Sequence, residues 1–216
     1  MKIKHLNGAY FRAISNQKNC NDMYETFLER NTDCIRQTVD DAFIAQYADI
    51  APESLTTLWK EVGLGIFCNG LFRIINPEEF QDFADEYNSD SFNKTVLPFM
   101  ATAFGDIFVY ANHSIIGEYV IYINVRYGTY KNLGNNIALL LNKCVFNKSI
   151  LKAWFKVEHY AEIKDKVGLP QLDECLGYVP ALALGGTETD DNIQILKIVP
   201  YIEIIAQSIG EFERIE

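Results

Sequence analysis

The residues with the clearest capacity for chemistry are two groups of acids in the C-terminal third of the chain. Asp173 and Glu174 are adjacent, and Glu188, Asp190 and Asp191 follow within one short polar segment. Carboxylates placed in this way can bind a cation, act as a general acid and base, or present negative charge to a basic partner. The spacing is not that of an EF-hand loop, and acids in turns are commonly solvated. These three functional uses and a structural one stay open at this point.

Other catalytic patterns are not found. His5, His113 and His159 are scattered, without the HExxH spacing of a zinc site, and no GxSxG or GxGxxG motif occurs. Cys68 and Cys175 would act as nucleophiles only with a histidine beside them, and inert thiols are the favoured interpretation. The sequence therefore predicts no catalytic residue, no metal site, no cofactor and no enzyme activity.

The charge balance favours a basic partner over nucleic acid. The formal net charge is −10, from 19 basic and 29 acidic residues. Residues 51–100 carry 3 basic and 8 acidic residues, residues 101–150 carry 4 and 2, and residues 151–216 carry 6 and 12. Direct binding to nucleic acid requires a basic patch, whereas the two acidic segments here would attract a basic protein. Acidic surfaces are also ordinary for proteins of the cytosol.

Targeting signals are not evident. The five cysteines are an odd number without a CxxC pair, which is typical of reduced thiols. The first residues, MKIKHLNGAYFRAISN, contain no uninterrupted apolar core of a signal peptide, and no run approaches the ~20 apolar residues of a membrane span. We therefore expect a cytoplasmic protein without membrane contact.

The segment that must position these residues is a predicted hairpin in the middle of the chain. Residues 107–111 and 119–125 are rich in β-branched and aromatic side chains and flank a polar break at 112–114. Both faces of the second run are largely apolar. We therefore expect the hairpin to lie in the middle of a sheet that is covered on both faces.

The spacing of apolar residues on either side of the hairpin predicts the remaining helices and strands. Apolar spacing predicts helices over 21–35, 40–47, 52–63, 149–155 and 158–167, one starting at Asn76–Pro77, and one starting at Pro200. Strands are predicted at 66–68 and 71–75 around an Asn69–Gly70 turn, at 127–133 and at 193–199, a strand or arm at 1–18 and a loop at 169–186. This pattern predicts an α+β fold with a central, mostly antiparallel sheet covered by helices. Residues 1–50 are expected to form a helical segment packed on a main domain of residues 51–216.

Three tracts in fixed order resemble a known family. They are LTTLWKEVG at 55–63 with GLFRIINPEEF at 70–80, PFMATAFGDIFVY at 98–110, and LDECLGYVPALALGG at 172–186. Together these tracts resemble the GAD-like immunity proteins of bacterial type VI secretion and polymorphic-toxin systems. The similarity runs from about residue 51 to about residue 210.

The resemblance implies an α+β protein that binds and neutralises a cognate toxin, in the best-described cases a DNase. No catalytic motif of the family can be carried over. A nuclease presents a basic cleft to phosphate, so an acidic inhibitor can occupy that cleft. The expected partner-binding residues are Asp173, Glu174, Glu188, Asp190, Asp191, Glu78 and Glu79, in a monomer or weak dimer.

Two alternatives remain at this stage. The helix ending in Trp59-Lys60-Glu61-Val62-Gly63 also resembles, more weakly, the SUKH (Smi1/Knr4-like) protein-binding modules. A small-molecule or metal-dependent enzyme that uses the acids of residues 173–191 is the other alternative, although no nucleophile or ligand pattern accompanies these acids.

Overall fold

The structure is a computed structural model that describes residues 22–86 and 94–215. The strand or arm predicted over residues 1–18, together with His5, lies outside the described residues. In the described part of the chain, eight α-helices and ten strands are found. The helices are α1 (Glu25–Glu29), α2 (Asp41–Tyr47), α3 (Glu53–Glu61), α4 (Pro77–Glu86), α5 (Ile137–Asn142), α6 (Lys148–Phe155), α7 (Val157–Val167) and α8 (Ile198–Ile209). The strands are β1 (Ile35–Gln37), β2 (Leu64–Phe67), β3 (Phe72–Ile74), β4 (Lys94–Thr102), β5 (Ile107–His113), β6 (Gly117–Asn124), β7 (Thr129–Asn132), β8 (Glu174–Tyr178), β9 (Ile193–Lys197) and β10 (Glu213–Arg214).

Eight of the strands form one sheet in the order β1-β2-β3-β4-β5-β6-β7-β10. All neighbouring strands in it are antiparallel except β7 and β10. The predicted hairpin is the β5–β6 pair, in which Val109 lies opposite Ile121. It occupies the interior of the sheet. The predicted α+β class with a mostly antiparallel sheet is therefore confirmed.

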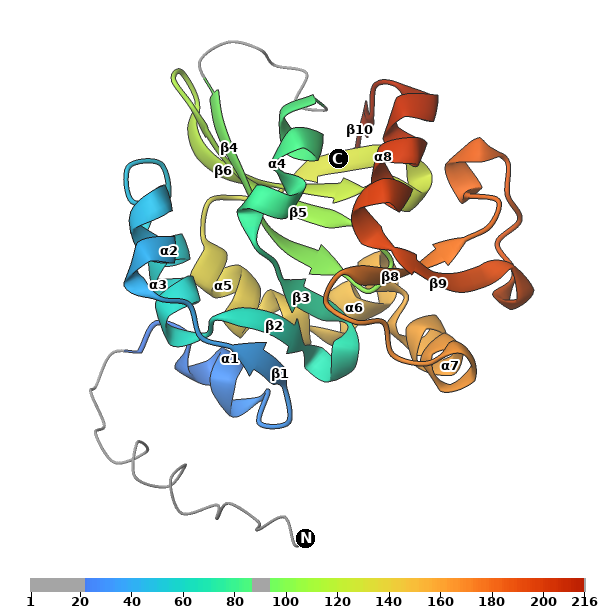
Figure 1. Ribbon diagram of the computed structural model, residues 1–216, viewed down its shortest axis with the longest axis horizontal. Helices are drawn as coiled ribbons and strands as arrows, with labels where there is room; N and C mark the ends of the chain where they lie inside the picture. The colour runs from blue at the N-terminus through green and yellow to red at the C-terminus, as the bar shows by residue number, and fades with distance from the viewer. Residues whose placement is uncertain (1–21, 87–93, 216) are drawn as a thin grey trace, which may run out of the picture.

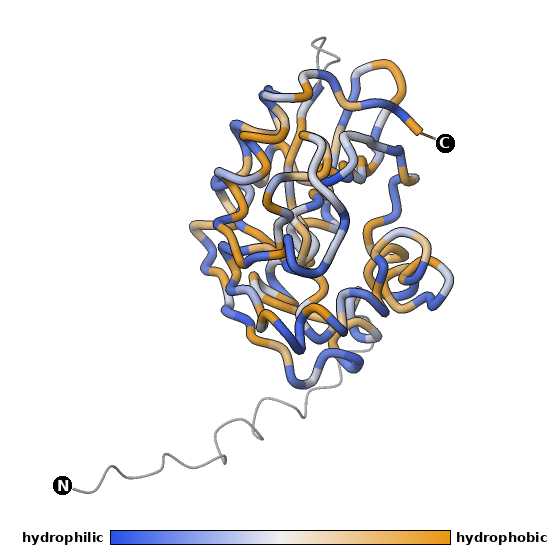
Figure 2. Tube along the Cα trace, turned by 90° about the vertical axis from the view of Figure 1, so that its right-hand side faces the viewer, coloured by the Kyte–Doolittle hydropathy of each residue, from blue (hydrophilic) through white to orange (hydrophobic). Residues whose placement is uncertain are grey.

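Helices cover both faces of this sheet, so that the molecule has three layers (Figure 1). One face packs against α1, α2, α3, α5, α6 and α7, and the opposite face against α4 and α8. Because side chains alternate along a strand, Phe108 of β5 belongs to the first core and Val109 to the second. Along the helices, hydrophobic and hydrophilic residues alternate, as expected for amphipathic helices packed on a sheet (Figure 2).

The helical segment near the N-terminus is confirmed, but its first helix is shorter than predicted. Of the predicted helix over 21–35, the described residues from 22 onward fold as α1, a turn and the start of the edge strand β1. Phe27 of α1 and Tyr47 of α2 are buried in the first core together with Trp59 of α3. Burial of each such large side chain contributes about 1.5–3 kcal/mol to the free energy of unfolding. The division at residue 50 stays a prediction.

Several local predictions need correction. The segment 169–186 is not only loop, because β8 lies within it and pairs with β9 as a separate two-stranded sheet. The helix predicted over 149–155 begins one residue earlier, at Lys148, and Asn147 caps it, since the Asn147 side chain accepts hydrogen bonds from two backbone N–H groups of the first turn. The run 137–145, which fits either period, is helical in α5. Strand β4, which contains Pro98, was not predicted; its register with β5 shifts between Pro98 and Met100.

A buried ionic network stabilises the centre of the sheet. The Asp106 carboxylate, in the β4–β5 turn, accepts hydrogen bonds from Arg126 at 2.6 and 3.2 Å, from the Tyr122 hydroxyl at 3.0 Å and from the Thr102 hydroxyl at 3.1 Å. Both charged side chains are at most 1% exposed. Burial alone would lower the pKa of Arg126, but the adjacent Asp106 outweighs it and raises that pKa. The network therefore depends on both partners.

Candidate partner-binding surface

Helix α4 places Glu78 and Glu79 on the surface. The Asn76 side-chain oxygen accepts a hydrogen bond from the Glu78 backbone N–H at 3.2 Å, and Pro77 occupies the first helical position. Both features favour a helix start at this point, and the positive end of the helix dipole favours acids in the first turn. Because Phe80 and Phe83 are buried on the inner side, the charged residues face solvent.

The acidic surface of α4 extends beyond the two predicted residues. We define the α4 acidic face as the five exposed acids of this helix, which are Glu78, Glu79, Asp82, Asp85 and Glu86. No lysine or arginine of residues 22–86 or 94–215 forms an ion pair with any of them. The last three were not predicted from the sequence, although they follow Glu78 and Glu79 at a helical spacing of three and four residues.

Asp173 and Glu174 lie at the start of β8. Buried Arg73 of β3 holds the preceding loop by donating to the carbonyl oxygens of Pro170 at 3.1 Å and of Gln171 at 3.3 Å. Lys197 of β9 pairs with the Asp173 carboxylate at 2.5 Å and with that of Glu174 at 3.3 Å. The hydrogen bond from Lys197 lowers the pKa of Asp173. These two acids are therefore partly neutralised by one lysine.

Asp173 also lies close enough to α4 to act on it electrostatically. The pKa of Glu79 is raised by burial first and then by the negative charges of Asp173 and Glu78. An acid whose pKa is raised by like charges would gain from a nearby cation. The structure thus brings together Glu78, Glu79 and Asp173, although Asp173 is more than 90 residues away along the chain.

The 188–191 loop, containing Glu188, Asp190 and Asp191, has a different environment. Glu188 pairs with Lys156 and accepts a hydrogen bond from the Tyr127 hydroxyl at 2.8 Å. Burial would raise the pKa of Glu188, but the hydrogen bonds from Lys156 and Tyr127 outweigh it, and the pKa is lowered. Glu188 is therefore held in place by a cation of its own chain.

Asp190 is the second anchored acid. It pairs with Lys166 and lies 3.0 Å from the Nε2 atom of His159. The hydrogen bond from Lys166 and then that from His159 lower the pKa of Asp190. Asp191 is exposed and forms no ion pair with a described residue. The 188–191 loop is therefore held by Lys156, which lies between α6 and α7, and by Lys166 of α7, whereas the other predicted acids lie on α4 and at the start of β8.

The candidate nucleophiles and metal ligands do not form a site in the described residues. Burial raises the pKa of the Cys68 thiol and of the Cys175 thiol to about 12 in each case, so both are protonated at neutral pH. In residues 22–86 and 94–215, no group of three His, Cys, Asp or Glu side chains is arranged to hold a metal ion. Within the same residues, no helix has the length and apolarity needed to cross a membrane.

Comparison with known proteins gives a family and a fold. Residues 22–124 match the GAD-like domain family, and residues 135–208 match the C-terminal region of the type VI secretion system immunity protein Tdi1. No curated protein gives a significant sequence match. The crystal structure of Atu4351 from Agrobacterium tumefaciens is similar in fold, with a TM-score of 0.70 and 20% identity over 86% of this chain and 89% of that chain.

The two matched ranges follow one another along the chain and include α4, β8 and the 188–191 loop. The resemblance noted in the sequence is thereby confirmed. The immunity-protein family implies a role in binding a toxin effector and not in catalysis. The chain is therefore similar to the GAD-like immunity proteins of type VI secretion systems over residues 22–124 and 135–208.

Proposed function

We propose that this protein binds a cognate DNase effector of a type VI secretion system and neutralises it through the α4 acidic face. The observation that carries the proposal is the set of five exposed carboxylates on α4 without an ion-pair partner in the described residues. A DNase binds phosphate through lysines and arginines, so its substrate cleft offers a complementary charge. In this proposal the protein acts in the cytoplasm as a monomer or weak dimer, without a cofactor and without binding nucleic acid.

Electrostatic availability distinguishes the α4 acidic face from the other acids. A carboxylate that already pairs with a lysine of its own chain must give up that pair before it binds a cation of a partner. Within the described residues Glu78 and Glu79 have no such pair to break, and the repulsion of Glu79 by Asp173 would be relieved by a partner cation. Long-range attraction of this kind chiefly raises the association rate.

The remaining predicted residues have secondary places in the proposal. Asp173 lies at the border of the α4 acidic face, and Lys197 limits its charge and that of Glu174. Within the 188–191 loop, Asp191 is the acid most available to a partner, whereas Glu188 and Asp190 hold the loop in place. A contact of the toxin with this loop would therefore add to the α4 contact.

The test is co-purification of the chain with the product of the adjacent toxin-like reading frame, followed by a DNA-cleavage assay of that product. We expect a stable complex and loss of cleavage at equimolar immunity protein. Inhibition that persists when DNA is in excess would show that the protein acts by binding the toxin and not by binding the DNA substrate. A complex that still cleaves DNA, or the lack of any complex, would overturn the proposal.

A further inference from the structure

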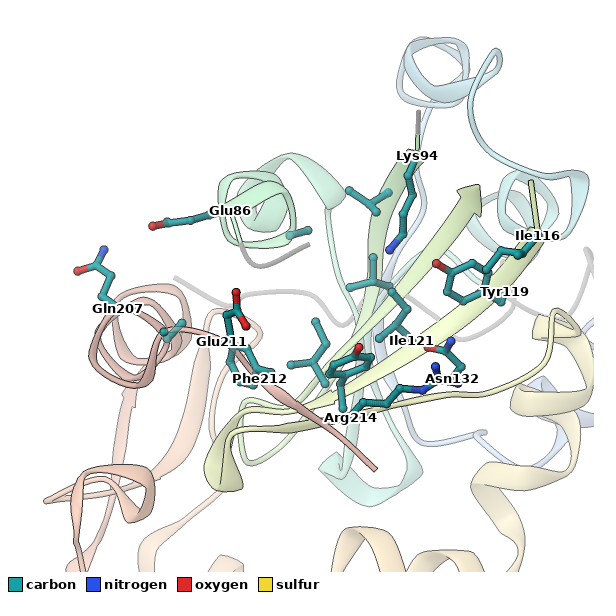
Figure 3. A pocket seen from close by; sticks show the side chains of 17 residues that line it. Glu86, Lys94, Ile116, Tyr119, Ile121, Asn132, Gln207, Glu211, Phe212 and Arg214 are labelled. Atoms are coloured by element: carbon teal, nitrogen blue, oxygen red, sulfur yellow. The ribbon is translucent and has the colours of Figure 1, made fainter. Parts of the chain in front are cut away.

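A cavity lies on the sheet face that carries α4 and α8, and Glu86 is the one residue of the α4 acidic face that lines it. Its volume is about 540 Å³, within the range of sites that bind small molecules. The ends of α4 and α8, the β5–β6 hairpin, β7 and the segment 210–214 surround it. Figure 3 shows the side chains that line it.

The floor of the cavity is apolar. It is made by inward-facing residues of three adjacent central strands, which are Val96 of β4, Val109 of β5, and Ile121 and Ile123 of β6. Phe212, from the segment after α8, adds a wall. An unbranched or aryl apolar group lying on this floor would remove water from both surfaces, which is favourable in proportion to the area buried.

Charged side chains are separated around the rim. Lys94 of β4 and Arg214 of β10 lie on the β-hairpin side, near Tyr119 and Asn132, and the Lys94 ammonium is 5.4 Å from the centre of the Tyr119 ring (Figure 3). Arg214 is exposed and forms no ion pair with residues 22–86 or 94–215. On a chain of net charge −10, two cations beside an apolar floor are a local exception.

The two acids that line the cavity lie on the other side of it. Glu86 is the last residue of α4 and Glu211 lies two residues after α8, and their carboxylates point away from the Arg214 guanidinium (Figure 3). The cavity therefore has a positive and a negative side with an apolar floor between them. This polarity sets the orientation in which a charged amphipathic molecule would bind.

We propose that the cavity binds a small amphipathic monoanion, specifically a medium-chain carboxylate. The apolar chain lies on the floor of Val96, Val109 and Ile121, and the carboxylate lies beside Arg214 and Lys94. Arginine suits this role because its planar guanidinium can donate two parallel hydrogen bonds to a carboxylate. The inference is independent of the proposed function, since it requires no toxin.

The test compares three ligands that share an eight-carbon chain, which are octanoate, octanol and octylammonium. Binding of any of them to the native state raises the melting temperature by mass action. At about ten times its dissociation constant, octanoate is expected to raise that temperature by about 3–6 °C. Octanol and octylammonium are expected to give a smaller shift at the same concentration. Equal shifts for the three, or none for octanoate, would overturn the proposal.

Variants place the binding in the cavity. The double variant K94Q/R214Q removes both positive charges and is expected to raise the dissociation constant of octanoate at least about tenfold. The matched control R30Q/K148Q makes the same charge change at exposed sites elsewhere and is expected to leave binding unchanged. Val96→Phe should fill the floor and abolish the shift. If this variant fails to fold, the charge pair still decides the outcome.

A segment of a toxin is the competing occupant. If octanoate does not bind but K94Q/R214Q weakens toxin binding, the cavity is part of the protein interface and the proposal of a small ligand is wrong. If octanoate binds and toxin inhibition fails, the cavity proposal stands and the proposed function falls. The two proposals can thus fail separately.

Discussion

The α4 acidic face and the 188–191 loop have similar composition but differ in the availability of their charge. On α4, five carboxylates face solvent without an ion-pair partner in the described residues. In the loop, Lys156 binds Glu188, and Lys166 binds Asp190. Formal charge therefore says little about which acids can attract a partner. The difference lies in the cations that tertiary packing brings to each acid.

The loop is also connected to the buried centre of the sheet. Glu188 accepts a hydrogen bond from Tyr127, and the Tyr127 ring lies 5.6 Å from the guanidinium carbon of Arg126. Arg126 in turn pairs with Asp106. Aromatic rings attract cations at this separation. Glu188 thus lies at the surface end of a chain of polar contacts that begins in the core at Asp106.

The largest effect is expected at the buried end of that chain. Asp106→Asn keeps the shape of the side chain but leaves the Arg126 charge without its carboxylate in a fully buried position. Breaking a buried pair in this way costs about 3–5 kcal/mol. We expect a corresponding loss in the free energy of unfolding, measured by urea denaturation.

The exposed pair Lys152–Glu158 provides the control for this prediction. Its side chains are 69% and 71% exposed. We expect Glu158→Gln to change the free energy of unfolding by less than about 1 kcal/mol. Similar losses for Asp106→Asn and Glu158→Gln would show that the central network does not stabilise the fold as described.

The next effect concerns the α4 acidic face and depends on the proposed toxin. The triple variant E78Q/E79Q/D82N is expected to lower the association rate constant with the toxin about tenfold and to weaken its dependence on salt. The matched control E25Q/E29Q/D33N removes the same charge from the surface near α1. Surface plasmon resonance at low and high ionic strength measures the association rate constant of each variant and its dependence on salt. Equal effects of the two variants would indicate general attraction by net charge and no α4 contact.

Most of the fold could be predicted from the helical or strand periodicity of the apolar residues. The β5–β6 hairpin, α2, α3 and β9 were readable because their apolar residues follow one period and turn residues bound them. The pattern over 137–145 fitted both periods, and only packing makes it helical. Strand β8 was missed because its short run lies between prolines and turn residues. The β8–β9 pairing is tertiary information that no local pattern contains.

The site was less predictable than the fold. Helical spacing after Glu78 and Glu79 was sufficient to extend the acidic surface to Asp82 and Asp85. In contrast, the partners of Glu188 and Asp190 are 24 to 61 residues away along the chain, on α7, at the residue before it and in the turn after β6. Without the packing of these elements, the sequence made anchored and available acids look alike.

A smaller effect is expected in the loop. Glu188→Gln removes the charge partner of Lys156, whose side chain is 36% exposed, and such pairs contribute about 0.2–1 kcal/mol. We expect faster amide hydrogen exchange in residues 187–192 and little change in toxin affinity. Lys152→Gln, on the neighbouring α6 surface, serves as the control. A loss of toxin affinity as large as that of the α4 triple variant would mean that the loop is a principal contact.

The smallest effect is a difference in pH dependence between the two regions. The folded pKa of Glu188 is lowered from 4.5, so its charge stabilises the fold above pH 4.5, and this contribution is lost as the pH falls through the folded pKa. The pKa of Glu79 is raised from 4.5, so its charge costs stability above that raised pKa, and protonation relieves the cost. The helix dipole favours the Glu79 charge and limits the effect.

Melting temperatures of Glu188→Gln and Glu79→Gln, measured against the parent protein from pH 3 to pH 7, test this difference. At pH 7 the first variant should melt below the parent and the second at or slightly above it. Both differences should shrink as the pH falls, because each parent carboxyl becomes protonated below its own folded pKa and then resembles the amide. A Glu79→Gln variant that melts well below the parent at pH 7 would show that the dipole outweighs the cost of burial and the repulsion by Asp173. The α4 acidic face would then stabilise the fold as the loop does, and the contrast between the two regions would rest on partner binding alone.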